Sequence, residues 1–67
     1  MAKSDKQRFF NLYTYFAQDY EVYNERHQFD KADDKAWLAV SYARELGFEP
    51  LEHLALAAKR AEERWAA

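Results

Sequence analysis

The side chains of this sequence that could hold a metal ion are two histidines and the acids near them. Carboxylate di-metal sites in helical bundles use the pattern Glu-x-x-His. Neither His27 nor His53 has a glutamate three residues before it, because Asn24 and Pro50 occupy those positions. Glu49 and His53 are four residues apart, which is typical of a surface pair at a helix start. The sequence therefore predicts no metal site and no cofactor.

Groups for covalent catalysis are equally scarce. The chain has no cysteine, and its serines are Ser4 near the N-terminus and Ser41 within a predicted helix. A nucleophile needs a base held beside it, and neither serine has an obvious one. A single glycine excludes phosphate-cradling loops of the Walker or dinucleotide type. The acidic pairs at 33–34 and 62–63 fit a helix start and a solvated helix face, so we predict that the protein is not an enzyme.

Length and charge exclude further classes of protein. The 67 residues carry ten Lys and Arg against twelve Asp and Glu, and no segment has the basic excess that nucleic-acid binding through counterion release requires. No apolar run is long enough to span a membrane, and MAKSDKQR is followed by no signal-peptide core. We expect a mature cytoplasmic protein that forms a single helical domain, 1–67, with residues 1–4 as a disordered leader.

Turn signals are few, which predicts few elements. Gly47 is suited to the left-handed conformation that ends a helix, and Pro50 fits the first turn of the next helix. Asp30 is a candidate N-cap, with Asp33 adding negative charge at the same helix start. The sequence predicts an all-α, compact three-helix domain with helices at about 5–27, 31–46 and 50–66.

The first predicted helix is rich in aromatic residues. Residues 9–23 read FFNLYTYFAQDYEVY, and Tyr, Phe and Val also favour strands, so a hairpin is the alternative. The AQD between its two halves carries no hairpin turn signal, and the helical spacing fits better. The residues that recur at spacings of four and three on one stripe are Phe9, Tyr13, Phe16, Tyr20, Tyr23 and His27.

The other two helices offer small residues as a complement to these rings. Eight alanines lie between residues 32 and 61, and alanine leaves grooves that aromatic side chains can fill. We expect the first helix to pack against both others. The predicted core positions are Ala36, Trp37, Val40, Ala43 and Leu46 on the second helix and Leu51, Leu54, Ala58, Ala61 and Trp65 on the third.

Three large apolar residues lie off the main stripe of the first helix. Tyr15, Val22 and Phe29 are spaced by seven, and Arg26 flanks them. Three helices leave no spare helix to cover this second face, so we expect a second copy of the chain or a larger protein to cover it. The simpler alternative is that the three residues are ordinary surface. Tyr42 is a further predicted exposed ring.

Residues 41–56, SYARELGFEPLEHLAL, resemble the helix-turn-helix pattern of DNA-binding proteins. Ala43 would be the small residue of its first helix, Gly47 the turn residue and Phe48 the apolar residue after it. His53 stands where an apolar residue is expected. The resemblance implies DNA contacts from Lys59, Arg60 and Arg64.

Together these patterns predict a small protein that binds other macromolecules without chemistry. We expect a non-enzymatic adaptor, regulator or inhibitor of a larger protein, of the compact kind that phages and mobile elements encode. We also expect it to form a homodimer through its first helix. Its interface residues would be Tyr15, Val22, Arg26, Phe29 and Tyr42. The alternative is a helix-turn-helix transcriptional regulator.

Overall fold

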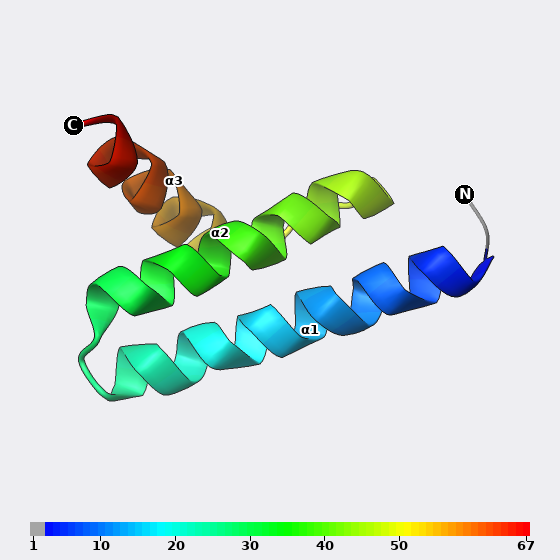
Figure 1. Cartoon of the computed structure of the whole chain (residues 1–67), viewed down its shortest axis with the longest axis horizontal. Coiled ribbons are helices and arrows are strands. Elements are labelled where there is room, and N and C mark those ends of the chain that lie inside the picture. The colour runs from blue at the N-terminus through cyan, green and yellow to red at the C-terminus, as the bar shows by residue number, and fades with distance from the viewer. Residues whose placement is uncertain (1–2) are drawn as a thin grey trace.

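Three α-helices make up the fold in the computed structural model, which describes residues 3–67 (Figure 1). They are α1 (Lys3–Glu25), α2 (Phe29–Leu46) and α3 (Glu52–Ala66), and the described residues contain no strand. The predicted all-α, three-helix fold is confirmed, and residues 9–23 lie in one helix instead of a hairpin. Of the predicted leader, residues 1–2 lie outside the described part of the chain, and α1 begins at Lys3.

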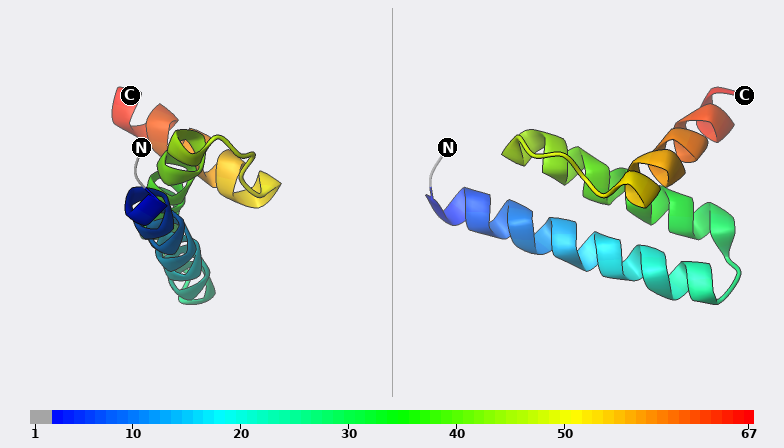
Figure 2. Two further views of the ribbon diagram at one scale, coloured as in Figure 1. Left: turned by 90° about the vertical axis from the view of Figure 1, so that its right-hand side faces the viewer. Right: turned by 180° about the vertical axis from the view of Figure 1, so that it is seen from behind.

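The second helix is the centre of the arrangement. α1 and α2 run antiparallel as a long hairpin, and α3 crosses α2 on the side away from α1 (Figures 1 and 2). The prediction that the first helix packs against both others is only half right, because α2 makes the extensive contacts with α1 and with α3. α1 meets α3 where the His53 ring lies 5.6 Å from the Tyr20 ring and 3.5 Å from the Glu21 carboxylate.

Both helices of the hairpin end in the same backbone motif. At the end of α2, Gly47 has φ 81°, its N–H donates to Arg44 O, and the Phe48 N–H donates to Ala43 O. This is the Schellman arrangement that the glycine predicted. α1 ends in the same way without a glycine: His27 has φ 59°, its N–H donates to Asn24 O, and the next N–H donates to Tyr23 O.

Four predicted helix boundaries differ from the structure by two residues, and the first is the start of α1, at Lys3 instead of residue 5. The left-handed His27 stops α1 at Glu25 instead of residue 27. α2 begins at Phe29, so Asp30 lies in its first turn and is not the N-cap, a position that Gln28 occupies. α3 begins at Glu52 after the N-cap Leu51, which leaves Pro50 outside the helix.

The core is small and made mostly of alanine. Its buried cluster consists of Tyr20, Ala32, Ala36, Val40, Leu54, Ala57 and Ala58, with Tyr13, Ala17, Tyr23 and Trp37 packed against it. Leu54 and Val40 are the largest fully buried side chains. The predicted complementarity of α1 rings and alanine-lined helices is therefore present, but most of the rings lie over the alanines and remain partly exposed.

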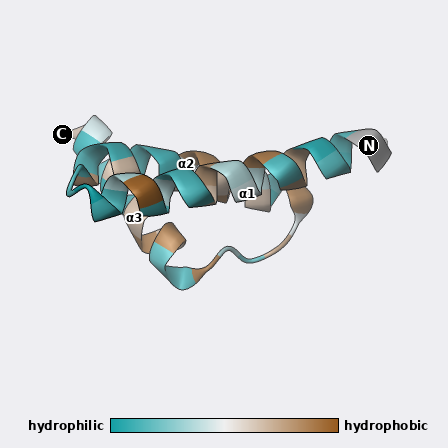
Figure 3. Cartoon of the chain, turned by 90° about the horizontal axis from the view of Figure 1, so that it is seen from below, coloured by the Kyte–Doolittle hydropathy of each residue, from teal (hydrophilic) through white to brown (hydrophobic). Residues whose placement is uncertain are grey.

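Several predicted core residues lie at the surface. His27 is exposed after the end of α1, and Leu51 and Trp65 are exposed at the two ends of α3. The chain is also more open than its mass requires: its accessible surface is 4803 Å², against about 4450 Å² for a folded monomer of this mass. Seen from below, the connection between α2 and α3 swings out beside the hairpin (Figure 3).

Candidate protein-binding surface

The outer face of α1 carries two of the predicted interface residues. Tyr15 is 57% exposed and Val22 is 43% exposed, because both point away from the alanine side of α2. Arg26 lies one turn after Val22, since its backbone N–H donates to Val22 O at 3.2 Å. These three residues share one side of the same helix and its last turn.

Phe29 does not continue this line on α1, contrary to the predicted spacing by seven. The left-handed His27 reverses the chain, so Phe29 is the first residue of α2. It is 54% exposed, and its ring centroid lies 5.6 Å from the His27 ring. Its surroundings are the turn residues His27 and Gln28 and the α2 residues Asp30 and Lys31, which line a shallow hollow with it.

A row of four aromatic rings joins the predicted residues Tyr15 and Tyr42. The Tyr15 ring packs edge-on against Phe16 at 5.3 Å, Phe16 stacks on Tyr42 at 6.0 Å with nearly parallel planes, and Tyr42 meets Phe9 at 5.4 Å. We call these four residues the ring row. Phe9, Phe16 and Tyr42 are each half-buried, so Tyr42 is less exposed than predicted, and Phe9 and Phe16 are not fully core residues.

One lysine belongs to the same surface. The Lys35 ammonium lies 5.7 Å from the centroid of the Phe16 ring, which is the geometry of a cation–π contact. Lys35 also lines a hollow of about 290 Å³ with Tyr23, Lys31 and Asp34. Lys35 is not among the residues predicted for the interface, although its place seven residues before Tyr42 on α2 puts it on the same side of that helix.

A separate apolar groove lies at the open end of the hairpin. It has a volume of about 450 Å³ and is lined by Phe10, Leu46 and Phe48, with Lys6 and Gln7 at its polar side. Tyr13 links its two rings, at 6.4 Å from Phe10 and 5.0 Å from Phe48. Sequence periodicity did not reveal this groove, because Phe48 reaches it from the connection after α2.

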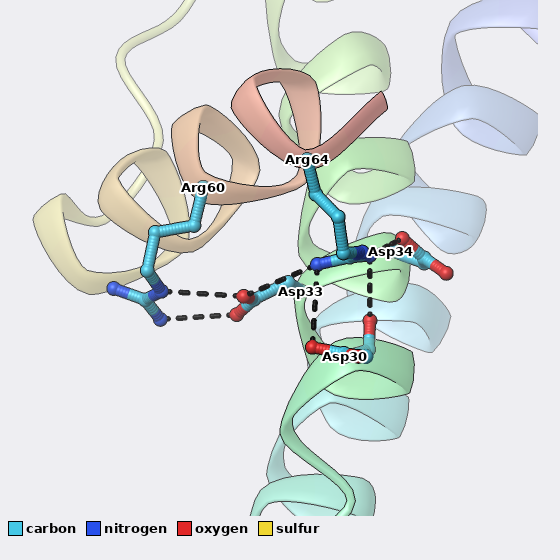
Figure 4. A network of polar contacts seen from close by, with 5 residues as sticks. All are labelled: Asp30, Asp33, Asp34, Arg60 and Arg64. Atoms are coloured by element: carbon cyan, nitrogen blue, oxygen red, sulfur yellow. Dashed lines mark hydrogen bonds and ion pairs between the residues drawn. The ribbon is translucent and has the colours of Figure 1, made fainter. Parts of the chain in front are cut away.

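The predicted DNA-contacting arginines are engaged within the fold. Arg60 donates two hydrogen bonds to the buried carboxylate of Asp33, from Nε to Oδ2 at 3.2 Å and from Nη2 to Oδ1 at 3.0 Å (Figure 4). Arg64 lies among three carboxylates: it bonds Asp34, and its Nη1 is 3.5 Å from Asp30 Oδ1 and 3.9 Å from Asp33 Oδ2. The hydrogen bonding that Arg60 donates to the Asp33 carboxylate raises the pKa of Arg60 above its usual value, against a smaller opposing effect of burial.

This network bears directly on the helix-turn-helix alternative. A DNA phosphate would have to compete with Asp33 for Arg60 and with three carboxylates for Arg64. Lys59 is exposed beside them on α3 and is in no ion pair among residues 5–67. The acidic and basic members follow spacings of three or four residues on α2 and α3, a pattern from which this helix pairing could have been recognised.

His53, a histidine considered as a metal ligand, faces α1 and contacts Glu21 and Tyr20. The described part of the chain contains no cluster of three or more His, Cys, Asp or Glu side chains arranged to hold a metal ion. Across residues 3–67, α1, α2 and α3 all lack the combination of length and apolarity that crossing a membrane requires. In comparisons with known proteins, no family model, no curated protein and no solved structure matches this chain.

Proposed function

We propose that this chain is a non-enzymatic protein-binding module, a small adaptor, regulator or inhibitor that acts in the cytoplasm and recognises its partner through the outer face of α1 and the adjoining ring row. The partner is a larger protein, a second copy of the chain, or both. The proposed activity is recognition of a macromolecule without a covalent step.

The observation that carries the proposal is the exposure of Tyr15 beside Val22 on a regular helix. At 57% exposure, Tyr15 leaves on the order of 100 Å² in water. Covering that area is worth about 2.5 kcal/mol at ~25 cal/mol per Å², which is the scale of a residue that dominates an interface. Tyrosine also supplies a hydroxyl that can be hydrogen-bonded at the edge of such a contact.

A second copy of the chain is a specific candidate for the partner. Domains below about 70–80 residues seldom obtain a secure margin of stability from one core and are commonly reinforced by self-association. Here the core contains few large side chains, and the chain has no disulfide. Association through α1 would cover Tyr15 and Val22 of both copies at once, because a two-fold interface uses the same patch twice.

Site-specific cross-linking tests the proposal. A photoreactive benzophenone side chain would replace Tyr15 in one variant and Leu56 in the other. Leu56 is the matched control because it is an apolar residue of similar exposure, 51%, on α3. We expect a discrete cross-linked species from position 15 and not from position 56, and we expect Val22→Glu to abolish it.

The mass of the product distinguishes the partners. A species at twice the monomer mass of 8.0 kDa identifies a second copy, and sedimentation at micromolar concentration should then show a dimer that Val22→Glu dissociates. A heavier product identifies another protein. Equal labelling from both positions, unchanged by Val22→Glu, would refute the use of the α1 face.

A further inference from the structure

The hairpin of α1 and α2 has one side that α3 does not cover. α3 packs on the side of α2 that carries Asp33 and Trp37, through the Asp33–Arg60 ion pair and a hydrogen bond from Trp37 Nε1 to Glu62 Oε1. Another side of α2 carries Lys31, Lys35 and Tyr42, whose spacings of four and seven place them on one line of the helix. Together with rings of α1 they form a surface that we call the hairpin face: Phe9, Phe16, Tyr23, Lys31, Lys35 and Tyr42.

Contacts make this surface continuous. Tyr42 touches Phe9 and Phe16, and Lys35 lies over Phe16. Lys35 then lines the hollow that also contains Tyr23 and Lys31. From Phe9 to Tyr23 the surface follows α1 for about 21 Å, the length of four helical turns.

The charge of the hairpin face differs from that of the whole chain. Neither Lys31 nor Lys35 is in an ion pair among the residues whose side chains the structure describes, 5–67. The one carboxylate in their hollow, Asp34, is held by Arg64 from α3. A chain with net charge −2 therefore presents two uncompensated cations at the edge of an aromatic surface.

From this combination we infer that the hairpin face binds an acidic amphipathic helix of a partner protein. The apolar side of that helix lies over the half-buried rings, and its carboxylates reach Lys31 and Lys35. The inference rests on the proposed protein-binding function and names the chemistry of the partner. A helix is the element that fits, because the side-chain ridges of one helix pack into the side-chain grooves of another, and α3 already packs against α2 on the other side.

The same rings are poorly arranged for nucleic acid. Phe16 and Tyr42 stack on each other with an angle of 2° between their planes, and Lys35 covers Phe16. Single-stranded nucleic acid binds by stacking its bases on free ring faces along a basic groove. The hairpin face offers half-buried rings and two lysines, so it fits an acidic protein helix better than a single-stranded nucleic acid.

An unbiased selection tests the inference with a defined probe. The whole chain would be immobilised and used to select from a library of random 16-residue peptides, without any bias in charge. We expect enriched peptides to be acidic, with apolar residues at helical spacings of three and four. We also expect their binding to weaken with added salt, because exposed charges are screened.

Charge reversal then locates the site on the chain. In Lys31→Glu/Lys35→Glu, affinity for the selected acidic peptide should fall by about tenfold or more, since two attractions become repulsions. The control is Lys59→Glu, an exposed lysine on α3 outside the hairpin face, which should change affinity by less than about twofold. Circular dichroism of each variant checks that its helices are intact.

Each remaining outcome overturns the inference. Neutral or basic enriched peptides, an absence of enrichment, or equal effects of the α2 and α3 reversals would each do so. If random single-stranded RNA binds in a way that depends on Lys31 and Lys35, the ligand of the hairpin face is a nucleic acid and not a protein helix. The cross-linking at Tyr15 is read independently, so a failed selection with positive cross-linking rejects the acidic helix and leaves the protein-binding function standing.

Discussion

Replacing Arg60 with alanine should destabilise the fold more than replacing Asp33 with alanine, although both changes remove the same ion pair. The Asp33 side chain is 8% exposed and the Arg60 side chain 57%. Without Arg60, a buried carboxylate keeps only Arg64, whose Nη1 is 3.9 Å away. Without Asp33, the guanidinium of Arg60 is already largely in water.

The expected magnitudes lie between two limits. Removing one partner of a fully buried pair costs about 3–5 kcal/mol, and an exposed pair is worth about 0.2–1 kcal/mol. Because one partner here is buried and the other exposed, and Arg64 compensates in part, we expect Arg60→Ala to lower the free energy of unfolding by about 2 kcal/mol. Asp33→Ala should lower it by about 1 kcal/mol, since alanine's better helix propensity offsets part of the loss.

Urea unfolding followed by circular dichroism measures both values, with Lys59→Ala as a control that should stay within about 0.5 kcal/mol of the parent. The double variant should cost less than the sum of the singles, which measures the coupling of the pair. The reasoning is wrong if Asp33→Ala costs more than Arg60→Ala, or if Arg60→Ala behaves like the control.

The pH dependence of this pair has a definite sign. The Asp33 hydrogen bond raises the pKa of Arg60 in the folded state, so the stabilisation is present below the unfolded-state pKa and is lost as the pH rises through the folded-state pKa. Both pKa values lie far above neutral pH for arginine. The stability difference between the parent and Arg60→Ala should therefore stay constant from about pH 6 to pH 9, and a clear change in that range would contradict the assignment.

Three further substitutions test the core and the two helix ends by the same unfolding measurement. Leu54→Ala removes the largest fully buried side chain and should cost about 3 kcal/mol; a loss below about 1 kcal/mol would mean that the core collapses around the gap. Gly47→Ala should cost about 1 kcal/mol from its positive φ alone, because an added Cβ meets nothing within 4 Å. His27→Gly should stabilise by about 0.5 kcal/mol, the relief of its positive φ exceeding the glycine entropy cost, and a loss of stability would show that the His27–Phe29 ring contact matters more.

The number of helices and the end of α2 could be predicted because the signals are local. Glycine is the one residue type that takes the left-handed conformation without a steric cost, and Gly47 adopts this conformation at the end of α2. The end of α1 could not be predicted in the same way, because a histidine adopts the corresponding conformation at position 27. The hydrogen bonds from the His27 and Gln28 N–H groups to Asn24 O and Tyr23 O hold this conformation. Phe29 belongs to α2 as a consequence.

The Asp33–Arg60 pair shows a different limit of sequence analysis. At the N-terminus of a helix, an aspartate is explained by capping and by the helix dipole, so Asp33 had a sufficient local role. Its long-range role depends on α3 crossing α2 with Arg60 opposite, and that crossing is set by packing of Leu54, Ala57 and Ala58 on α2. A local role that fully explains a residue, as helix capping does for Asp33, can therefore hide its main long-range contact, here the ion pair with Arg60.

The alanines of α2 connect the fold to the proposed binding function. Small residues let the helices approach closely, and Tyr20 is the one aromatic side chain that the core of the described residues buries. Phe9, Phe16 and Tyr42 are consequently only half-buried, so folding leaves part of their favourable transfer from water unrealised. A partner that covers these rings would bury their remaining exposed surface and gain this free energy. The hairpin would not have to move, because the helices that carry the rings are already formed.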